Sequence, residues 1–295
     1  MTSIAPATRM GAVHLAVTDG EQALHFYEHV VGLTLMGREN DGTIRMGVPG
    51  LELVVLHPGA RRPVLRGTSG LYHLAIVVPS RRELARAVGR LINIGYPHAP
   101  TDHVLTKSDY LWDPDGNGIE IYTETPEDGT WEFANGTFRS RARDGSLRSG
   151  RDPIDIPQLL AELHPDDSLE EPMPEGTRMG HVHLHVHDLS EAVDFYHGVL
   201  GFDITGVAET WGAAFVSAGG YHHHLGLNTW AGEGAPQAPD DASGLRHFTI
   251  EVPSQSDLSI VTARLKEQGA VLTESGAGVF VRDPSGNRVH LKTQE

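Results

Sequence analysis

The stretch Asp113-Pro-Asp-Gly-Asn-Gly-Ile-Glu-Ile-Tyr122 joins a turn to an apolar strand that carries a single carboxylate, Glu120. Its Pro, Gly, Asp and Asn residues predict the turn, and the apolar run behind them predicts the strand. A second copy spans residues 283–291 and reads Asp-Pro-Ser-Gly-Asn-Arg-Val-His-Leu, with His290 in the place of Glu120. The repetition predicts a duplicated fold whose copies differ at one chemically important position.

Two further repeats lie upstream of these strands. Met10-Gly-Ala-Val-His-Leu-Ala-Val17 matches Met179-Gly-His-Val-His-Leu-His-Val186, and Gly70-Leu-Tyr-His-Leu-Ala-Ile-Val-Val-Pro-Ser80 matches Gly244-Leu-Arg-His-Phe-Thr-Ile-Glu-Val-Pro-Ser254. Each stretch alternates like a strand and is followed by a helical pattern and by shorter β-rich runs with Gly turns. The sequence therefore predicts an α+β fold of four βαβββ modules, numbered 1 to 4 along the chain.

The modules fall into two halves separated by a segment of different composition. We expect modules 1 and 2 in residues 9–125 and modules 3 and 4 in residues 178–293, with their longer helices at 81–94 and 255–268. Between the halves, residues 126–177 are rich in Pro, Gly, Arg and acidic groups. This segment is predicted to be a linker with one short helix and a mostly solvated surface.

Composition narrows the classes of function. The chain of 295 residues has 23 Lys and Arg against 39 Asp and Glu, a net charge of −16, which disfavours nucleic acid and anionic membranes as partners. No run approaches the roughly 18 apolar residues that span a bilayer, so we expect a cytoplasmic protein. Without Cys, any metal must be held by His, Asp or Glu, and the chain has 18 His.

The four modules in this order resemble the vicinal oxygen chelate superfamily, which includes glyoxalases, bleomycin and fosfomycin resistance proteins and extradiol dioxygenases. Four modules in one chain are most similar to the type I extradiol, or catechol 2,3-, dioxygenases. The resemblance implies two half-barrel domains and a cofactor that is Fe(II), with Mn(II) as the alternative. It also implies a small aromatic diol and O2 as substrates, and a homo-oligomer.

In that family the metal ligands lie on the first strand of one module and on the first and last strands of its partner. The resemblance places His181 at the first position in module 3, where module 1 has Ala12. It places His73 and Glu120 at the other two positions in module 2. Two His and one carboxylate form the facial triad that is typical of non-haem Fe(II) oxygenases. This ligand set implies that modules 2 and 3 pair across the two halves.

A second pairing stays open. If modules 3 and 4 were partners, the ligands would be His181, His247 and His290, a site of three His without a carboxylate.

The resemblance also implies acid and base residues near the metal. It places a catalytic His at His223, where module 1 has Leu53, and a catalytic Tyr at Tyr110, where module 4 has Phe280. A third catalytic residue falls at His103 after a shift of about two residues in the alignment. Modules 2 and 3 therefore carry the full set, and modules 1 and 4 do not.

Strand alternation suggests roles for the other clustered His. In Gly180-His-Val-His-Leu-His-Val186 the three His share one face, with successive members about 6.6 Å apart, so His183 and His185 are expected to line the substrate pocket. In Tyr221-His-His-His-Leu225 the same alternation points His223 away from its two His neighbours. We expect those neighbours at the surface or at an interface.

Three functions fit the resemblance. The first is an Fe(II)-dependent extradiol dioxygenase that cleaves a catechol-type ring with O2. The second is a glyoxalase-like, metal-dependent isomerase or thiol transferase, although such chains are commonly shorter and use more carboxylate ligands. The third is a non-catalytic protein that binds a small molecule or drug, which generally lacks an intact triad.

Overall fold

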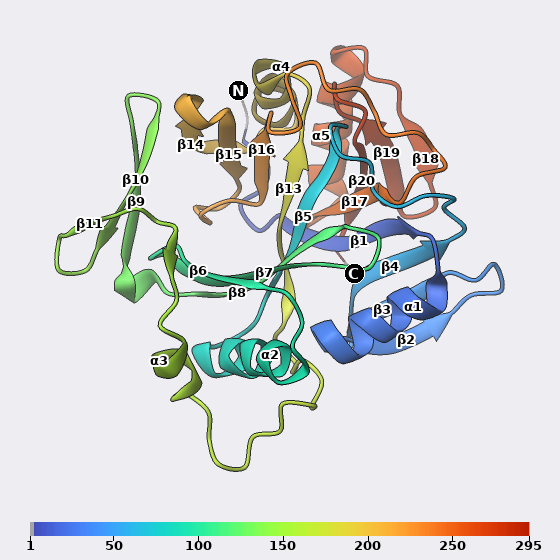
Figure 1. The fold of residues 1–295 in the computed structure, drawn as a ribbon. Coiled ribbons are helices and arrows are strands. Elements are labelled where there is room, and N and C mark those ends of the chain that lie inside the picture. The colour runs from blue at the N-terminus through green and yellow to red at the C-terminus, as the bar shows by residue number, and fades with distance from the viewer. Residues whose placement is uncertain (1–2, 295) are drawn as a thin grey trace.

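The structure is a computed structural model that describes residues 3–294. Within these residues the predicted fold class is confirmed: four βαβββ modules form an eight-stranded and a nine-stranded sheet, both open (Figure 1). Each sheet combines one module from each half of the chain. Modules 1 and 4 build the eight-stranded sheet. Modules 2 and 3 build eight strands of the other sheet, and its ninth strand comes from the segment between the halves.

The strand order explains this exchange. The eight-stranded sheet runs β18 (Thr273–Ser275), β19 (Gly278–Arg282), β20 (Arg288–Thr293), β17 (Gly244–Val252), β1 (Arg9–Val17), β4 (Leu51–Pro58), β3 (Ile44–Val48) and β2 (Thr34–Arg38). The nine-stranded sheet runs β12 (Asp152–Pro153), β6 (Ala99–Asp102), β7 (Thr106–Trp112), β8 (Gly118–Glu124), β5 (Gly70–Val77), β13 (Arg178–His185), β16 (Leu225–Asn228), β15 (Ala213–Ser217) and β14 (Asp203–Ala208). The antiparallel pairs β1 with β17 and β5 with β13 join the halves.

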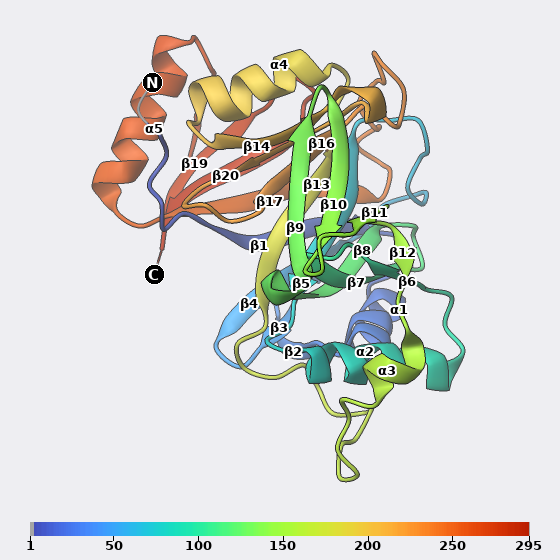
Figure 2. The same ribbon diagram turned by 90° about the vertical axis from the view of Figure 1, so that its left-hand side faces the viewer.

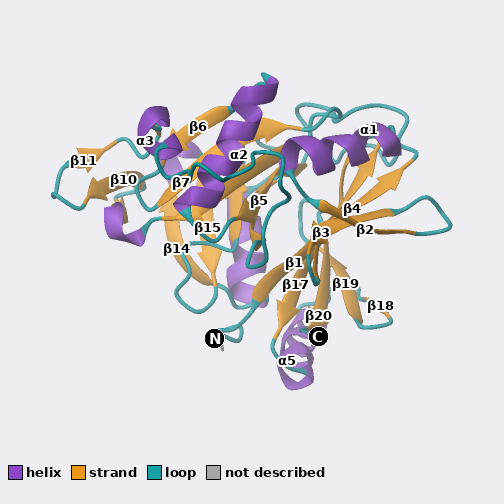
Figure 3. Ribbon diagram, turned by 90° about the horizontal axis from the view of Figure 1, so that it is seen from below, coloured by secondary structure: helices purple, strands orange, loops and turns teal. Residues whose placement is uncertain are grey.

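The helices begin where the sequence provides caps. The hydroxyl oxygen of Ser80 accepts a hydrogen bond from the Glu83 N–H at the start of α2 (Arg81–Ile94), and Gly95 ends that helix with a φ of 67°. Ser254 caps α5 (Gln255–Glu267) in the same way. Figure 3 shows α1 and α5 at the periphery of the strands. Among the described residues, no helix has both the length and the apolar character needed to cross a membrane.

The stretch Asp113–Tyr122 begins with a turn that is stabilised by its own first residue. The Asp113 carboxylate accepts hydrogen bonds from the backbone N–H groups of Asp115 and Asn117 and from the Asn117 amide. It also accepts one from the Tyr27 hydroxyl at 3.3 Å. In the second half, the Tyr196 hydroxyl donates to Asp283 at 3.0 Å. Each turn is therefore tied to the helix of the preceding module, so the two modules of one half stay connected although their strands enter different sheets.

Those Tyr residues lie in π-helical turns that extend two short helices. The turn Phe26–Val31 follows α1 (Gly20–His25), and the turn Asp194–Val199 follows α4 (Leu189–Val193).

The segment between the halves contains more structure than a linker. It has the predicted short helix, α3 (Ile156–Leu160), and a separate three-stranded sheet of β9 (Gly129–Ala134), β10 (Thr137–Ala142) and β11 (Leu147–Arg148). Asn135 and Gly136 form the turn between β9 and β10 with φ angles of 51° and 70°, the positive values that favour an Asn-Gly hairpin. Figure 2 shows this hairpin in front of β13 and β16. The prediction of a solvated linker missed it.

Candidate metal centre

Three neighbouring strands, β8, β5 and β13, bring His73, Glu120 and His181 together. The Nε2 atoms of His73 and His181 lie 3.0 and 3.1 Å from the same carboxylate oxygen of Glu120, and 3.3 Å from each other. All three side chains are buried. The alternative ligand set of three His, from modules 3 and 4, is divided between the sheets. His247 and His290 lie in the eight-stranded sheet, and His181 lies in the nine-stranded sheet.

A β-bulge aims His181 at this point. In the pairing of β13 with β5, Met179 faces Ile76 and His181 faces Ala75, so Gly180 is an extra residue without a partner of its own. Bulges redirect side chains and are common beside active sites. Val182, on the opposite face of β13, is fully buried in the apolar core.

The donor set fits a divalent cation. An octahedral ion with bonds of about 2.1 Å separates adjacent ligand atoms by about 3.0 Å, which is close to the spacing of the three donors. A carboxylate buried among apolar strands is costly unless it is paired or bound to a metal. Burial lowers the pKa of His181 to about 4, so its imidazole is neutral near pH 7 and has a lone pair to offer. His73, Glu120 and His181 could therefore hold the metal that the fold implies.

Glu120 stays ionised in this setting. Burial alone would raise the pKa of its carboxyl, but the neighbouring rings of His181 and His73 and their hydrogen bonds hold that pKa well below its usual range. The centre therefore carries the negative charge of Glu120 beside the neutral imidazole of His181.

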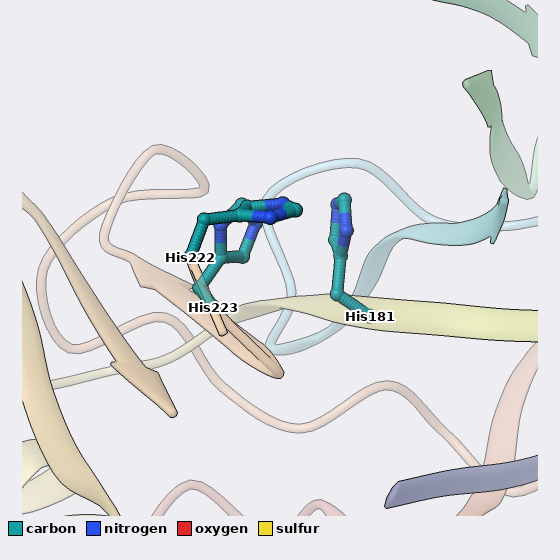
Figure 4. A group of neighbouring side chains, drawn as sticks. All are labelled: His181, His222 and His223. Carbon is teal, nitrogen blue, oxygen red and sulfur yellow. The ribbon is translucent and has the colours of Figure 1, made fainter. Parts of the chain in front are cut away.

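Two more His lie beside the centre. Ligand atoms of His181, His222 and His223 lie within 4.8 Å of one another, and Figure 4 shows the rings of His222 and His223 directed toward His181. The expectation that His222 and His224 lie at the surface or an interface is wrong for this chain, because the side chain of His222 is 5% exposed and His224 is buried. Strand alternation does not apply, because β16 begins only at Leu225.

A carboxylate holds His222. Its Nδ1 lies 3.4 Å from Glu124, which also accepts a hydrogen bond from Tyr221, while its Nε2 is buried without a partner among the described residues. His223 has no acidic partner in an ion pair of the described chain, and its ring stacks on Trp131 at 5.8 Å. Burial holds the pKa of His223 well below its ordinary value, so this ring is neutral.

Tyr110 and His103 form a hydrogen-bonded pair near Glu120. Tyr110 faces Glu120 across the pairing of β7 with β8, and its hydroxyl lies 2.9 Å from His103 Nε2. Because His103 Nδ1 donates to the Gly150 carbonyl at 2.6 Å, its Nε2 accepts the Tyr110 proton. Burial lowers the pKa of His103, and burial with the charge of Glu120 raises the pKa of Tyr110, so both groups are neutral.

The loop that presents His103 is strained. Val104 has a φ of 70°, a conformation that β-branched residues rarely adopt. Three hydrogen bonds hold the loop there: the Val104 N–H donates to Asp102, Thr125 donates to the Val104 carbonyl, and Trp131 donates to the His103 carbonyl. Strain that the surroundings enforce in this way is common at functional sites.

These groups line one cavity of about 680 Å³. The linker segment supplies part of the wall, including Trp131, Phe138 and Arg151, none of which the sequence analysis identified. The alternating aromatic residues around Asn135-Gly136 were the available signal. His183 lines this cavity, but His185 does not: it bonds Asn228 at 2.7 Å and lines a second cavity instead.

The eight-stranded sheet has different residues at the positions that form the metal centre in the nine-stranded sheet. Val13 pairs with Val54 as Val182 pairs with Leu225. Val54 and Leu225 are therefore equivalent, and counting back two residues from each makes Glu52 the equivalent of His223. The predicted match of Leu53 to His223 is wrong by one residue. Modules 1 and 4 thus have Ala12, Glu52, His247 and His290 at the positions of His181, His223, His73 and Glu120.

A Gly180→Ala substitution tests the bulge. A Cβ at Gly180 would collide with the hydroxyl of Tyr122, which is fully buried. Overpacking of this kind costs about 1 to 3 kcal/mol, and it would also displace His181. We expect lower stability in urea denaturation and weaker metal binding. Gly198→Ala, which has open space around the new methyl group, should change neither. Equal stability of the two variants would contradict this account.

Acid should destabilise the metal-free protein. Burial lowers the pKa values of His181 and His224 to about 4 and that of His14 to about 3, whereas unfolded His titrates near 6.5. The unfolded state therefore binds more protons as the pH falls from about 6.5 toward 4. Each His then costs on the order of 1 to 2 kcal/mol of stability at pH 5.

Asp113 offsets part of this loss, because burial raises its pKa to about 6 and its folded form takes up a proton first. Urea denaturation between pH 7 and 5 measures the net effect, and a free energy of unfolding that stays constant would refute it.

The fold and the site define the class of protein. The model of the Glyoxalase/Bleomycin resistance protein/Dioxygenase superfamily matches residues 9–121 and 178–291, so the chain belongs to this superfamily, and the resemblance to the vicinal oxygen chelate proteins is confirmed. It is 41% identical over 287 residues to a catechol-2,3-dioxygenase of Bacillus subtilis, covering 96% of each chain. It is also 28% identical to biphenyl-2,3-diol 1,2-dioxygenase 3 of Rhodococcus globerulus, over 39% of this chain and 62% of that one.

Solved structures support the fold alone. A structure from Bacillus subtilis superposes with a TM-score of 0.66 at 14% identity, covering 99% of this chain and 86% of the other. Glyoxalase I from Zea mays gives a TM-score of 0.56 at 15% identity, with 97% and 92% covered.

Proposed function

We propose that this protein is an extradiol ring-cleaving dioxygenase that acts on a catechol-type aromatic diol with O2. The observation that carries the proposal is the convergence of His73, Glu120 and His181 with His223 and Tyr110 on one cavity. The 41% identity to a catechol-2,3-dioxygenase over nearly the whole chain supports the same reaction. The carboxylate in the triad argues against the three-His alternative.

His73, Glu120 and His181 would hold Fe(II), with Mn(II) as the alternative. When bound, such an ion supplies Lewis acidity toward the two diol oxygens and redox chemistry toward O2. The protein contributes the remainder of the site. Apolar and aromatic side chains such as Leu111, Ile119 and Phe215 line the cavity, and the ionised Glu120 leaves the ligand set with a single negative charge.

Proton transfer falls to the groups around the triad. His223, which is neutral, would accept the proton of one diol hydroxyl and later return it. The hydroxyl of Tyr110, held by His103, would hydrogen-bond to the reacting oxygens. Both atoms of O2 enter the ring-opened product, so the reaction needs no external reductant. The cavity of about 680 Å³ is within the range that holds drug-sized ligands, and we expect it to accept substituted diols.

An oxygen electrode tests the proposal directly. The purified protein is loaded anaerobically with Fe(II) and mixed with catechol, and we expect one O2 consumed per catechol with formation of the ring-opened product. A parallel sample loaded with Mn(II) separates the two metals. If the protein retains a stoichiometric metal but consumes no O2 with catechol or substituted catechols, the dioxygenase assignment fails.

A further inference from the structure

A second cavity, of about 940 Å³, lies at the end of the eight-stranded sheet. Its wall is formed by the segment before β5, the loop before β17 and the turn between β19 and β20. It shares Tyr72, Trp112 and Trp230 with the cavity of the metal centre, so the two lie back to back. The proposed dioxygenase reaction does not use this cavity.

The duplication places arginines where the other sheet has cavity-lining residues. Phe248 pairs with Val289 as Leu74 pairs with Ile119, which fixes the equivalence of the two sheets. On this register, the residues equivalent to Tyr72, Trp112 and Gly118 are Arg246, Arg282 and Arg288. All three arginines line the second cavity.

The charge of this wall is opposite to that of the protein. Four arginines line the cavity, Arg66 with the three above, against a single acidic residue, Asp240. Over the whole chain acidic residues outnumber Lys and Arg by 39 to 23. No ion pair is found for any of the four within residues 3–294, whereas arginines elsewhere commonly pair, as Arg62 does with Asp241 at 2.7 Å.

The partners that the four arginines do have leave their charge uncompensated. Arg282 donates to the Gly286 carbonyl, and the guanidinium of Arg288 lies 3.8 Å from the centre of the Phe280 ring. Burial, together with repulsion from Arg282 and Arg246, lowers the pKa of Arg288. His57 and His247 also line the cavity. Burial lowers their pKa values, so both are neutral and leave the charge of the wall unchanged.

We propose that the second cavity is a binding site for a small multivalent oxyanion, a phosphate ester or a polycarboxylate, held by Arg66, Arg246, Arg282 and Arg288. The guanidinium group matches phosphate and carboxylate in a two-pronged geometry. Four such groups without acidic partners supply charge for at least two anionic groups, and the volume admits an organic molecule that carries them. Tyr72, beside His73, is the wall through which an occupant would contact the metal site.

Calorimetric titration with inorganic pyrophosphate at low salt tests the proposal. We expect one site per chain, with binding that weakens steeply as salt increases. Arg246→Gln and Arg288→Gln should each weaken binding about tenfold or more. Arg143→Gln, an exposed arginine outside both cavities, is the matched control and should bind like the wild type.

Two controls separate this site from the metal centre and from unfolding. Glu120→Ala should bind pyrophosphate as the wild type does, which excludes capture of the anion by a metal at Glu120. Arg246→Gln should keep or raise the melting temperature without ligand, because it removes like-charge repulsion. Absence of binding to the wild type, or equal binding by wild type and both cavity variants, would overturn the proposal whether or not catechol is cleaved.

Discussion

Replacement of Glu120 by Ala is expected to abolish metal binding and turnover together. Glu120 supplies the only carboxylate of the candidate triad, and its oxygen lies 3.0 to 3.1 Å from both imidazole Nε2 atoms. Without it, only the two His ligands remain, and a hard divalent cation loses both a ligand and the negative charge that balances it. Loss of the metal removes several kcal/mol of transition-state stabilisation, so turnover should fall by about a thousandfold or more.

Metal analysis and oxygen uptake on the same preparation measure this result. Glu120→Gln keeps the shape of the side chain and should lose the metal as well, which attributes the effect to charge and not to a cavity. The melting temperature of each metal-free variant shows whether the fold survives. Phe280→Tyr, which restores a Tyr at the matching position of the eight-stranded sheet, should leave metal content and turnover unchanged. A Glu120→Ala protein with full activity would contradict the assignment of Glu120 as a metal ligand.

Most of the fold could be predicted from the repeated sequence pattern, because the strand, helix and turn signals occur in the same order in every module. Alternating strands, helix caps such as Ser80 and Ser254, and the Asp-Pro turns recur four or two times at matching places. The family resemblance implied the pairing of modules 2 and 3, because it put a ligand at His181 where module 1 has Ala12. The alternative pairing of modules 3 and 4 stayed open until the strand order excluded it. The family's ligand positions, compared between the copies within one chain, thus pointed to a candidate site shared by both halves.

The remaining features depend on backbone detail that periodicity does not encode. His222 faces the centre because residues 221–224 are not a strand, so an alternation argument does not hold there. The aromatic wall from Trp131 and Phe138 depends on a hairpin between distant modules. The Asn135-Gly136 turn and the aromatic residues beside it are visible in the sequence, but their place against the other half of the chain is not. A one-residue error at Leu53 arose because equal apolar runs align equally well in two registers.

His223→Asn should lower kcat by about a hundredfold to ten-thousandfold while the metal stays bound, the usual size of a general acid–base contribution. Its neutral ring can accept a proton, and it lies beside His181 with a ring distance of 4.2 Å. Because His223 is not in the proposed triad, the metal content and the KM for catechol should change far less than kcat. The pH dependence of kcat should also lose the ionisation that this His contributes.

His222 is the competing proton carrier, because Glu124 orients it as a carboxylate orients a catalytic His and its Nε2 has no partner among the described residues. Under our assignment it positions its neighbours, so His222→Asn and Glu124→Gln should each lower kcat by only about tenfold. The comparison is decisive because His222 and His223 are adjacent in sequence and both close to His181. A larger loss in His222→Asn, shared by Glu124→Gln, would transfer the acid–base role to His222.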